Sequence, residues 1–261
     1  ADGGATDTSF VLTADEYAKI GITGLEATSG ESAKQTAKLA ILNEVIEGLT
    51  KATVDTIPEL QLVFDAADAL LRTIDGETPA ITKAQLGLLG FGVDDADADV
   101  TTDVTDDNLS AIQKALSDVN TSSNYDAVNT LAKVTTIVDD AIAALEAVKA
   151  EAADNDNGSV TVAQLEDMGV EGAVDTGNAG ANIALINSAL DTAAIASANV
   201  DTLEEVQALV TAAAKVVGLA GDAAAPKLVV ADLTKLGVDL TVLDSGNTQA
   251  NAIALLNDLI I

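Results

Sequence analysis

Residues 12–22 have the sequence LTADEYAKIGI, and three similar stretches follow along the chain. They are ITKAQLGLLGF at 81–91, VTVAQLEDMGV at 160–170 and LVVADLTKLGV at 228–238. Regular self-similarity of this kind is typical of a protein assembled from repeated structural units. We therefore interpret these stretches first and then the sequence between them.

Each stretch predicts a short helix with its own start and stop signals. In the first three, a threonine can cap the helix and a Glu or Gln three residues later can bind back to it, which makes a capping box. These pairs are Thr13 with Glu16, Thr82 with Gln85, and Thr161 with Gln164. The fourth stretch has Val229 at the cap, so its helix start is less well specified. Every stretch ends in a glycine and an apolar residue, which suits a Schellman stop; the glycines are Gly21, Gly90, Gly169 and Gly237.

A second helix is predicted after each stop. Its apolar residues are spaced three and then four apart, which places them on one helical face. A carboxamide residue stands near the centre of each of these helices, and the four are Asn43, Gln113, Asn187 and Asn257. One carboxamide alone performs no acid–base chemistry, so we interpret it as a polar residue at the edge of the apolar face.

A third helix is predicted in three of the units, at VDTIPELQLV (54–63), YDAVNTLAKV (125–134) and VDTLEEVQALV (200–210). Thr56 with Glu59 and Thr202 with Glu205 again form capping boxes. The middle helix has more room before the next stop and could extend to about Ala152, roughly two turns longer than the others at 1.5 Å per residue.

These patterns predict an all-α fold, a tandem array of three-helix bundles of about 70 residues each, because the stop glycines are 69, 79 and 68 residues apart. Units this small are marginally stable alone, so contacts between neighbours should matter. We expect this array to be part of a longer one. The alternative is that the end of the chain is disordered or swapped. The expected parts are a link at 1–11, units at 12–76, 77–157 and 158–224, and a partial fourth unit with two helices at 225–261.

Composition narrows the possible functions. The net charge is −30, from 42 acidic and 12 basic residues, which repels phosphate and disfavours nucleic acids and anionic membranes. No apolar run is long enough for a membrane span, so we expect no membrane insertion. The chain has neither cysteine nor histidine, so the usual general base and the commonest zinc ligands are missing and we expect no enzyme. Hydrophobic residues make up 48% of the sequence in a regular pattern, which argues against disorder.

Two acidic stretches are candidates for binding calcium, the one cofactor that the sequence suggests. The first, DNDNG at 154–158, alternates oxygen ligands before a glycine, but an EF-hand count from Gly158 places Ala153 and Gln164 at the two acidic positions. The second, at 94–107, holds seven aspartates. A plain turn for the first and a solvated loop for the second remain the alternatives. The candidate ligands are Asp154, Asp156, Asn157, Asp95, Asp97 and Asp99.

The segments QLEDMGV, NIALINSAL and VDTLEEVQALV, within 164–210, carry a resemblance to a known family. They resemble the GA module, the three-helix albumin-binding module related to protein G, and the helical repeats of giant bacterial surface adhesins of the RTX and biofilm-associated kinds. The resemblance implies a three-helix unit. Albumin binding does not follow, because the second helix, which makes that contact in the family, is poor here in Tyr and Lys.

The sequence therefore predicts a non-catalytic structural segment of a large secreted bacterial surface protein: an adhesin spacer, an extracellular filament, or a surface-layer or biofilm matrix component. High acidity, no cysteine and polar loops suit that location. Its partners would be neighbouring units and other copies of itself. The alternative is a multivalent binding module for a host or matrix protein. Drift of the residues expected to face solvent, at Lys38, Ser110 and Ala184, favours the structural function over binding.

Overall fold

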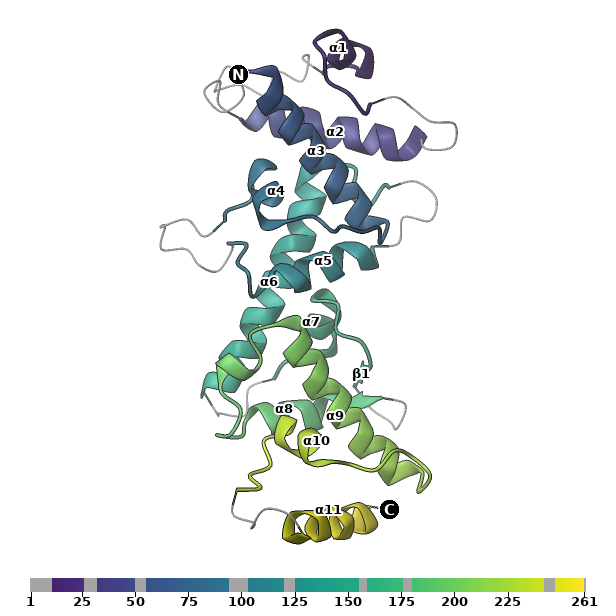
Figure 1. The fold of residues 1–261 in the computed structure, drawn as a ribbon, viewed down its shortest axis with the longest axis vertical. Helices are drawn as coiled ribbons and strands as arrows, with labels where there is room; N and C mark the ends of the chain where they lie inside the picture. Colours follow the sequence, from purple (N-terminus) through teal and green to yellow (C-terminus); the bar gives the residue numbers. More distant parts are fainter. Residues whose placement is uncertain are drawn as a thin grey trace. The chain divides into compact units, whose positions relative to one another are not determined.

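A computed structural model describes residues 11–25, 32–49, 55–93, 103–119, 125–154, 159–175, 180–241 and 247–260. This part of the chain is mostly helical, as the sequence predicts (Figure 1). The chain divides into two compact units, Ala1–Asp139 and Asp140–Ile261, and the boundary lies inside helix α6. Each unit is described by itself.

Four short helices have the predicted positions. They are α1 (Ala14–Lys19), α4 (Lys83–Leu88), α7 (Val162–Asp167) and α10 (Val230–Lys235). Thr13, Thr82 and Thr161 each accept a bond from the backbone N–H three residues on, and the Glu or Gln there binds back, which confirms the three capping boxes. At α10 the valine cap accepts no bond, and Asp232 accepts one from the Val229 N–H at 3.0 Å.

The predicted stops are confirmed too. The stop glycines have φ of +96°, +96°, +82° and +74°, the left-handed region that glycine favours. After α1, the Ile22 N–H donates to Tyr17 O and the Gly21 N–H to Ala18 O, which are the two bonds of a Schellman motif. The same pair of bonds closes α4, α7 and α10. Local sequence signals therefore determine where these four helices begin and end.

The longer helices follow in the predicted order. Second helices are α2 (Ser32–Gly48), α5 (Leu109–Asp118), α8 (Ile183–Leu190) and α11 (Asn247–Ile260); third helices are α3 (Ile57–Ile74), α6 (Leu131–Asp154) and α9 (Leu203–Gly221). Helix α6 has 24 residues against 18 in α3 and 19 in α9, so the expected extra length is present. A single 3-10 turn, η1 (Ser197–Asn199), precedes α9.

Two details of the third helices correct the sequence analysis. The middle one begins at Leu131 rather than near Tyr125, because Thr130 accepts from the Lys133 N–H at 3.3 Å and so occupies the capping position. At α9, Thr202 accepts from the Glu205 N–H, but the Glu205 carboxylate binds the N–H of Asp201 instead of that of Thr202.

A small amount of extended structure was not predicted. Strands β1 (Ala173–Val174) and β2 (Ala181–Asn182) pair in parallel, with Ala173 opposite Ala181. In the first unit, Val93 and Val104 form an isolated parallel bridge. Both pairings connect the residues after a short helix with those before the following second helix. They are too short to produce the alternating pattern by which strands are recognised in a sequence.

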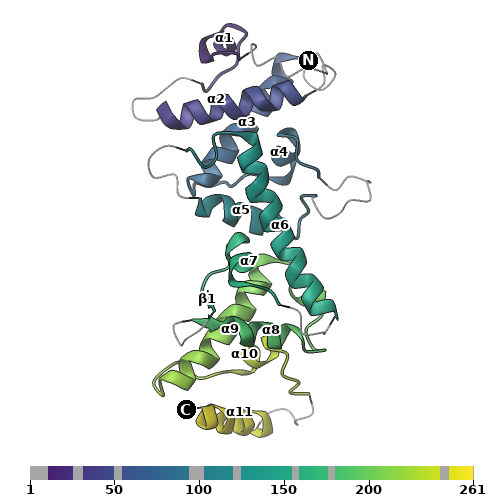
Figure 2. The ribbon, with the colours of Figure 1, turned by 180° about the vertical axis from the view of Figure 1, so that it is seen from behind.

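The third helices organise both units. In the first unit, α3 contacts α2, α4 and α5, and both ribbon views show it extending from α2 to α5 (Figures 1 and 2). In the second, α9 contacts α8, β2, α10 and α11. The core residues are mainly Ala, Val, Leu and Ile, and the aromatic rings of Tyr17 and Phe64 are also buried. No described helix combines the length and the apolar character that crossing a membrane requires.

Candidate functional site

The carboxamides at the centres of the second helices join them to the short helices. Asn187 accepts from the Val160 N–H at 3.0 Å, and its amide donates to Val160 O at 2.9 Å. Asn257 binds Leu228 in the same way, at 2.8 and 3.0 Å. Asn43 binds Leu12 at 3.2 and 3.1 Å. Each carboxamide thus pairs with a backbone N–H and C=O as an adjacent strand would.

These residues do lie at the edge of the core, and what the sequence did not reveal is their backbone partners. Their partner is always the apolar residue directly before the helix cap, 27 to 31 positions earlier in the chain. Gln113 departs from the pattern, because its longer side chain donates to Ile81 O at 2.6 Å without a described return bond. The apolar residues Ile81, Val160 and Leu228 are at most 3% exposed, so these hydrogen bonds lie at the edge of the core.

A second carboxamide anchor, absent from the sequence analysis, joins the third helix to the stop of the short helix. Gln207 accepts from the Glu171 N–H at 2.8 Å and donates to Glu171 O at 3.0 Å. Gln61 binds Thr23 in the same way, at 3.0 and 3.4 Å. Both glutamines stand five residues after the cap threonine, and both partners stand two residues after the stop glycine. That repeated spacing is the sequence signal that could have revealed them.

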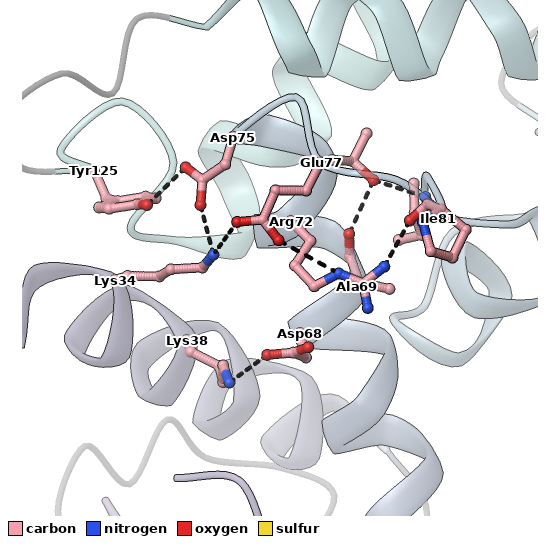
Figure 3. Close-up of polar contacts among 11 residues, drawn as sticks. Lys34, Lys38, Asp68, Ala69, Arg72, Asp75, Glu77, Ile81 and Tyr125 are labelled. Atoms are coloured by element: carbon pink, nitrogen blue, oxygen red, sulfur yellow. Dashed lines mark hydrogen bonds and ion pairs between the residues drawn. The ribbon is translucent and has the colours of Figure 1, made fainter. Parts of the chain in front are cut away.

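Charged side chains gather at the end of α3 and in the link that leads to α4 (Figure 3). Lys34 of α2 binds the Asp75 carboxylate at 2.5 Å and approaches that of Glu77 at 3.6 Å. Arg72 reaches Glu77 at 3.8 Å and donates to Pro79 O at 2.7 Å. These contacts hold the link between the first and second predicted units against α2 and α3.

Two uncharged side chains, Tyr125 and Thr73, reinforce the same junction. The Tyr125 hydroxyl donates to the Asp75 carboxylate at 2.6 Å, which connects a residue 50 positions away to the link (Figure 3). Thr73, 2% exposed, donates to Ala69 O and accepts from the Ile81 N–H at 2.6 Å. The residue before the α4 cap is therefore bound both by α3 and, through Gln113, by α5.

Lys38 was assigned to the solvent-facing surface, and that assignment was wrong. The residue is 2% exposed; its ammonium group binds the Asp68 carboxylate at 2.5 Å and Gly24 O at 3.2 Å, and it lies 4.8 Å from the centre of the Phe64 ring. A buried ammonium requires such partners, because an uncompensated charge in the interior is costly. Helical spacing alone could not show that Asp68, 30 residues later, supplies the countercharge.

The second unit has a junction of the same type between α9 and the helices that follow it. Lys215 of α9 binds the Asp232 carboxylate in the first turn of α10 at 2.6 Å. Beneath this ion pair, Leu219 of α9 packs in a buried cluster with Leu228, Leu233 and Ile253. In each compact unit, a third helix thus contacts the helix before it and the helices after it.

Three shifted pKa values in the first unit have structural causes. Burial raises the pKa of Tyr17 to about 12, and its hydroxyl donates to Asn43 at 2.8 Å. Bonds from the cap threonines lower the pKa of Glu16 and that of Glu59. All three residues belong to caps or anchors of the helices.

The candidate calcium ligands are not brought together by anything in the described structure. Asp95, Asp97, Asp99, Asp156 and Asn157 lie outside the described residues, and Asp154 is the last residue of α6, with no side chain described. Of the remaining aspartates in the second stretch, Asp106 pairs with Lys83 at 2.7 Å and Asp103 is buried. Within the described ranges, no group of three or more acidic side chains has the spacing of a metal site.

The described residues therefore form junctions between helices, in which carboxamides bind backbone groups and ion pairs connect neighbouring helices. A comparison with known protein families, with curated proteins and with solved structures finds no match for this chain.

Proposed function

We propose that this chain is a structural segment of a large secreted bacterial surface protein, a tandem array of three-helix modules that serves as a spacer or filament. The modules would be α1–α3, α4–α6 and α7–α9, with α10 and α11 as the first two helices of a fourth. The net charge of −30 and the polar loops suit the secreted location.

The observation that carries this proposal is that a third helix contacts helices on both sides of a junction. Helix α3 contacts α2 of its own module and both α4 and α5 of the next one. Helix α9 likewise contacts α8, α10 and α11. Modules joined only by linkers would move independently, whereas a helix packed on both sides of a junction resists bending. Resistance to bending is the property that a spacer or filament needs.

The polar contacts at the first junction support the same function. Lys34, Asp75 and Tyr125 come from three separate parts of the sequence and meet at one point. The side chains of Lys34 and Asp75 are 11% and 19% exposed, so solvent screens this pair less than a surface pair. The junction is therefore held by apolar packing along α3 and by partly buried charges at its end.

Spin-label distance measurements across this junction test the proposal. The chain has no native cysteine, so Ala18→Cys on α1 and Asp107→Cys before α5 allow specific labelling at two exposed positions. We expect one narrow distance distribution in the parent chain. Replacing both Lys34 and Asp75 with alanine should broaden it, whereas the control Lys19→Ala, at an exposed position, should not.

A parent distribution as broad as that expected for a flexible linker would contradict the spacer function. It would favour the alternative of separate binding modules on a string. Circular dichroism of each variant shows whether the helices remain folded, so that loss of the junction is distinguished from loss of the modules.

A further inference from the structure

A cavity of about 360 Å³ lies within the first compact unit, where three helices meet. Its walls come from the end of α2, the stop after α4 and the first part of α6. Val45, Leu89 and Leu131 belong to the apolar part of these walls. The volume is within the range found for small-ligand sites, so the cavity has room for a small organic molecule.

Two carboxylic side chains line the cavity from different helices, Glu44 of α2 and Asp139 of α6. The Glu44 carboxylate is held in place because it accepts from the Leu131 N–H at 2.5 Å, at the first residue of α6. A carboxylate has about four acceptor sites, so this one can bind a further donor. Neither Lys nor Arg is among the described residues that line the cavity. Its charge is therefore complementary to a cation.

An aromatic residue distinguishes this helix stop from the other three. Phe91 follows the stop glycine of α4, whereas the equivalent residues are Ile22, Val170 and Val238. Phe91 is half-buried and lines the cavity, as does Thr135, whose hydroxyl can accept a hydrogen bond. The face of an aromatic ring attracts an organic cation, most strongly where water is excluded. An aromatic ring beside two carboxylates therefore suits the recognition of amines.

We propose that this cavity, called the amine site, binds a small organic cation with an apolar body, such as an aryl or alkyl ammonium compound. The apolar body would fill the space beside Leu89 and Phe91, and the cationic group would bind near Glu44 and Asp139. Such a ligand would contact all three walls at once and so stabilise their packing. This activity goes beyond the spacer function and does not depend on it.

Benzylammonium is the probe, and benzyl alcohol, similar in size and shape but uncharged, is the matched ligand. Each is titrated into the isotope-labelled full chain at physiological salt, which screens the general attraction of cations to a net charge of −30. We expect saturable shifts in the amide resonances of Leu49, Gly90 and Thr135 with benzylammonium. The alcohol should bind about tenfold more weakly, because it makes no charge-assisted contact.

Variants of the chain locate the site. Glu44→Gln removes the charge but keeps an acceptor for the Leu131 N–H, so hydrogen exchange at the start of α6 should be unchanged while the affinity for benzylammonium falls about tenfold. The matched control is Glu47→Gln, at an exposed residue of the same helix that does not line the cavity, and it should leave the affinity unchanged. Phe91→Leu should weaken benzylammonium more than benzyl alcohol.

Three results would overturn the inference. They are the absence of saturable shifts, equal binding of the alcohol, and equal losses of affinity in Glu44→Gln and Glu47→Gln, which would mean general attraction to a negative chain. A blocked lysine, Nα-acetyl-lysine methylamide, tests the other source of an ammonium group. If it binds more tightly than benzylammonium, the cavity receives a lysine of a partner protein and the small-ligand assignment is wrong. None of these results affects the distance measurement that tests the array proposal.

Discussion

Replacing Asn187 with alanine removes both hydrogen bonds that hold the backbone of Val160 against α8. The backbone N–H and C=O would then lie without partners beside a side chain that is 3% exposed. A buried polar group that loses its partner costs about 1–3 kcal/mol. Because Asn187 is only half-buried, water can reach part of the space that alanine leaves. We therefore expect the lower part of the range for two groups, about 2–4 kcal/mol.

Amide hydrogen exchange is the suitable assay, because a chain of two compact units is not expected to unfold in one step. The Leu165 N–H, bonded to Thr161 O in the first turn of α7, reports opening of the anchored helix. A loss of about 2–4 kcal/mol corresponds to exchange roughly 30- to 700-fold faster, at about 1.4 kcal/mol per factor of ten.

Two companion variants make the measurement decisive. Asn187→Gln should lose about half as much stability, because Gln113 at the equivalent position makes a single described bond to the backbone before its helix. Ser188→Ala, at an exposed neighbour, should change the exchange by less than threefold. If alanine at position 187 also changes it by less than threefold, the anchor contributes no stability and the reasoning is refuted.

Three other outcomes are expected. Lys38→Ala should lower the free energy of unfolding by about 1–2 kcal/mol, because the Asp68 carboxylate would lose its ion-pair partner while water still solvates its side chain, which is 35% exposed. An unchanged melting temperature would contradict this. Gly237→Ala should destabilise the chain more than Gly90→Ala, because both glycines have positive φ but a Cβ at 237 would also collide with a threonine side chain; equal melting temperatures would count against that contact. Tyr17 has a folded-state pKa of about 12 against 10.0 unperturbed, so its contribution to the free energy of unfolding is complete below pH 10 and is lost as the pH rises towards 12. Tyrosinate absorbance follows the ionisation, and denaturant unfolding follows the stability of the parent chain and of Tyr17→Phe. If the two chains lose stability equally as the pH rises, this prediction is wrong.

The sequence predicted the short helices well because their signals are local. A cap threonine and its Glu or Gln are three residues apart, and a stop glycine lies within one turn of the carbonyls that it satisfies. The start of α6 was missed because Tyr125 and Asp126 resemble the Val-Asp pair before α9. The structure shows that Val128, at 0% exposure, is the equivalent of Val200, at 1%. Residues 128–131, VNTL, also resemble VDTL at 200–203, so burial and sequence together give the correct alignment.

The junction residues could not be predicted in the same way. Asn187 and Val160 are 27 residues apart, and Lys38 and Asp68 are 30 residues apart. No helical periodicity relates such positions, and a lysine on a predicted helix is ordinarily expected to face water. Only the packing of one helix on another brings these pairs together. The repeat itself contained the missing information, since a carboxamide at the same place in all four second helices is a pattern that an unanchored edge residue would not require.

The carboxamide anchors also explain how the repeats can diverge in sequence and keep one architecture. An anchor that binds the N–H and C=O of residue 12, 160 or 228 makes no demand on the side chain there. Leu, Val and Ile can therefore replace one another before the caps as the local core requires, while the second helix keeps its register on the short helix. The glutamines of α3 and α9 act on the backbone in the same way, so one binds a threonine and the other a glutamate at equivalent places. Backbone-directed polar contacts thus fix the arrangement of the helices, and apolar side chains of variable size fill the space between them.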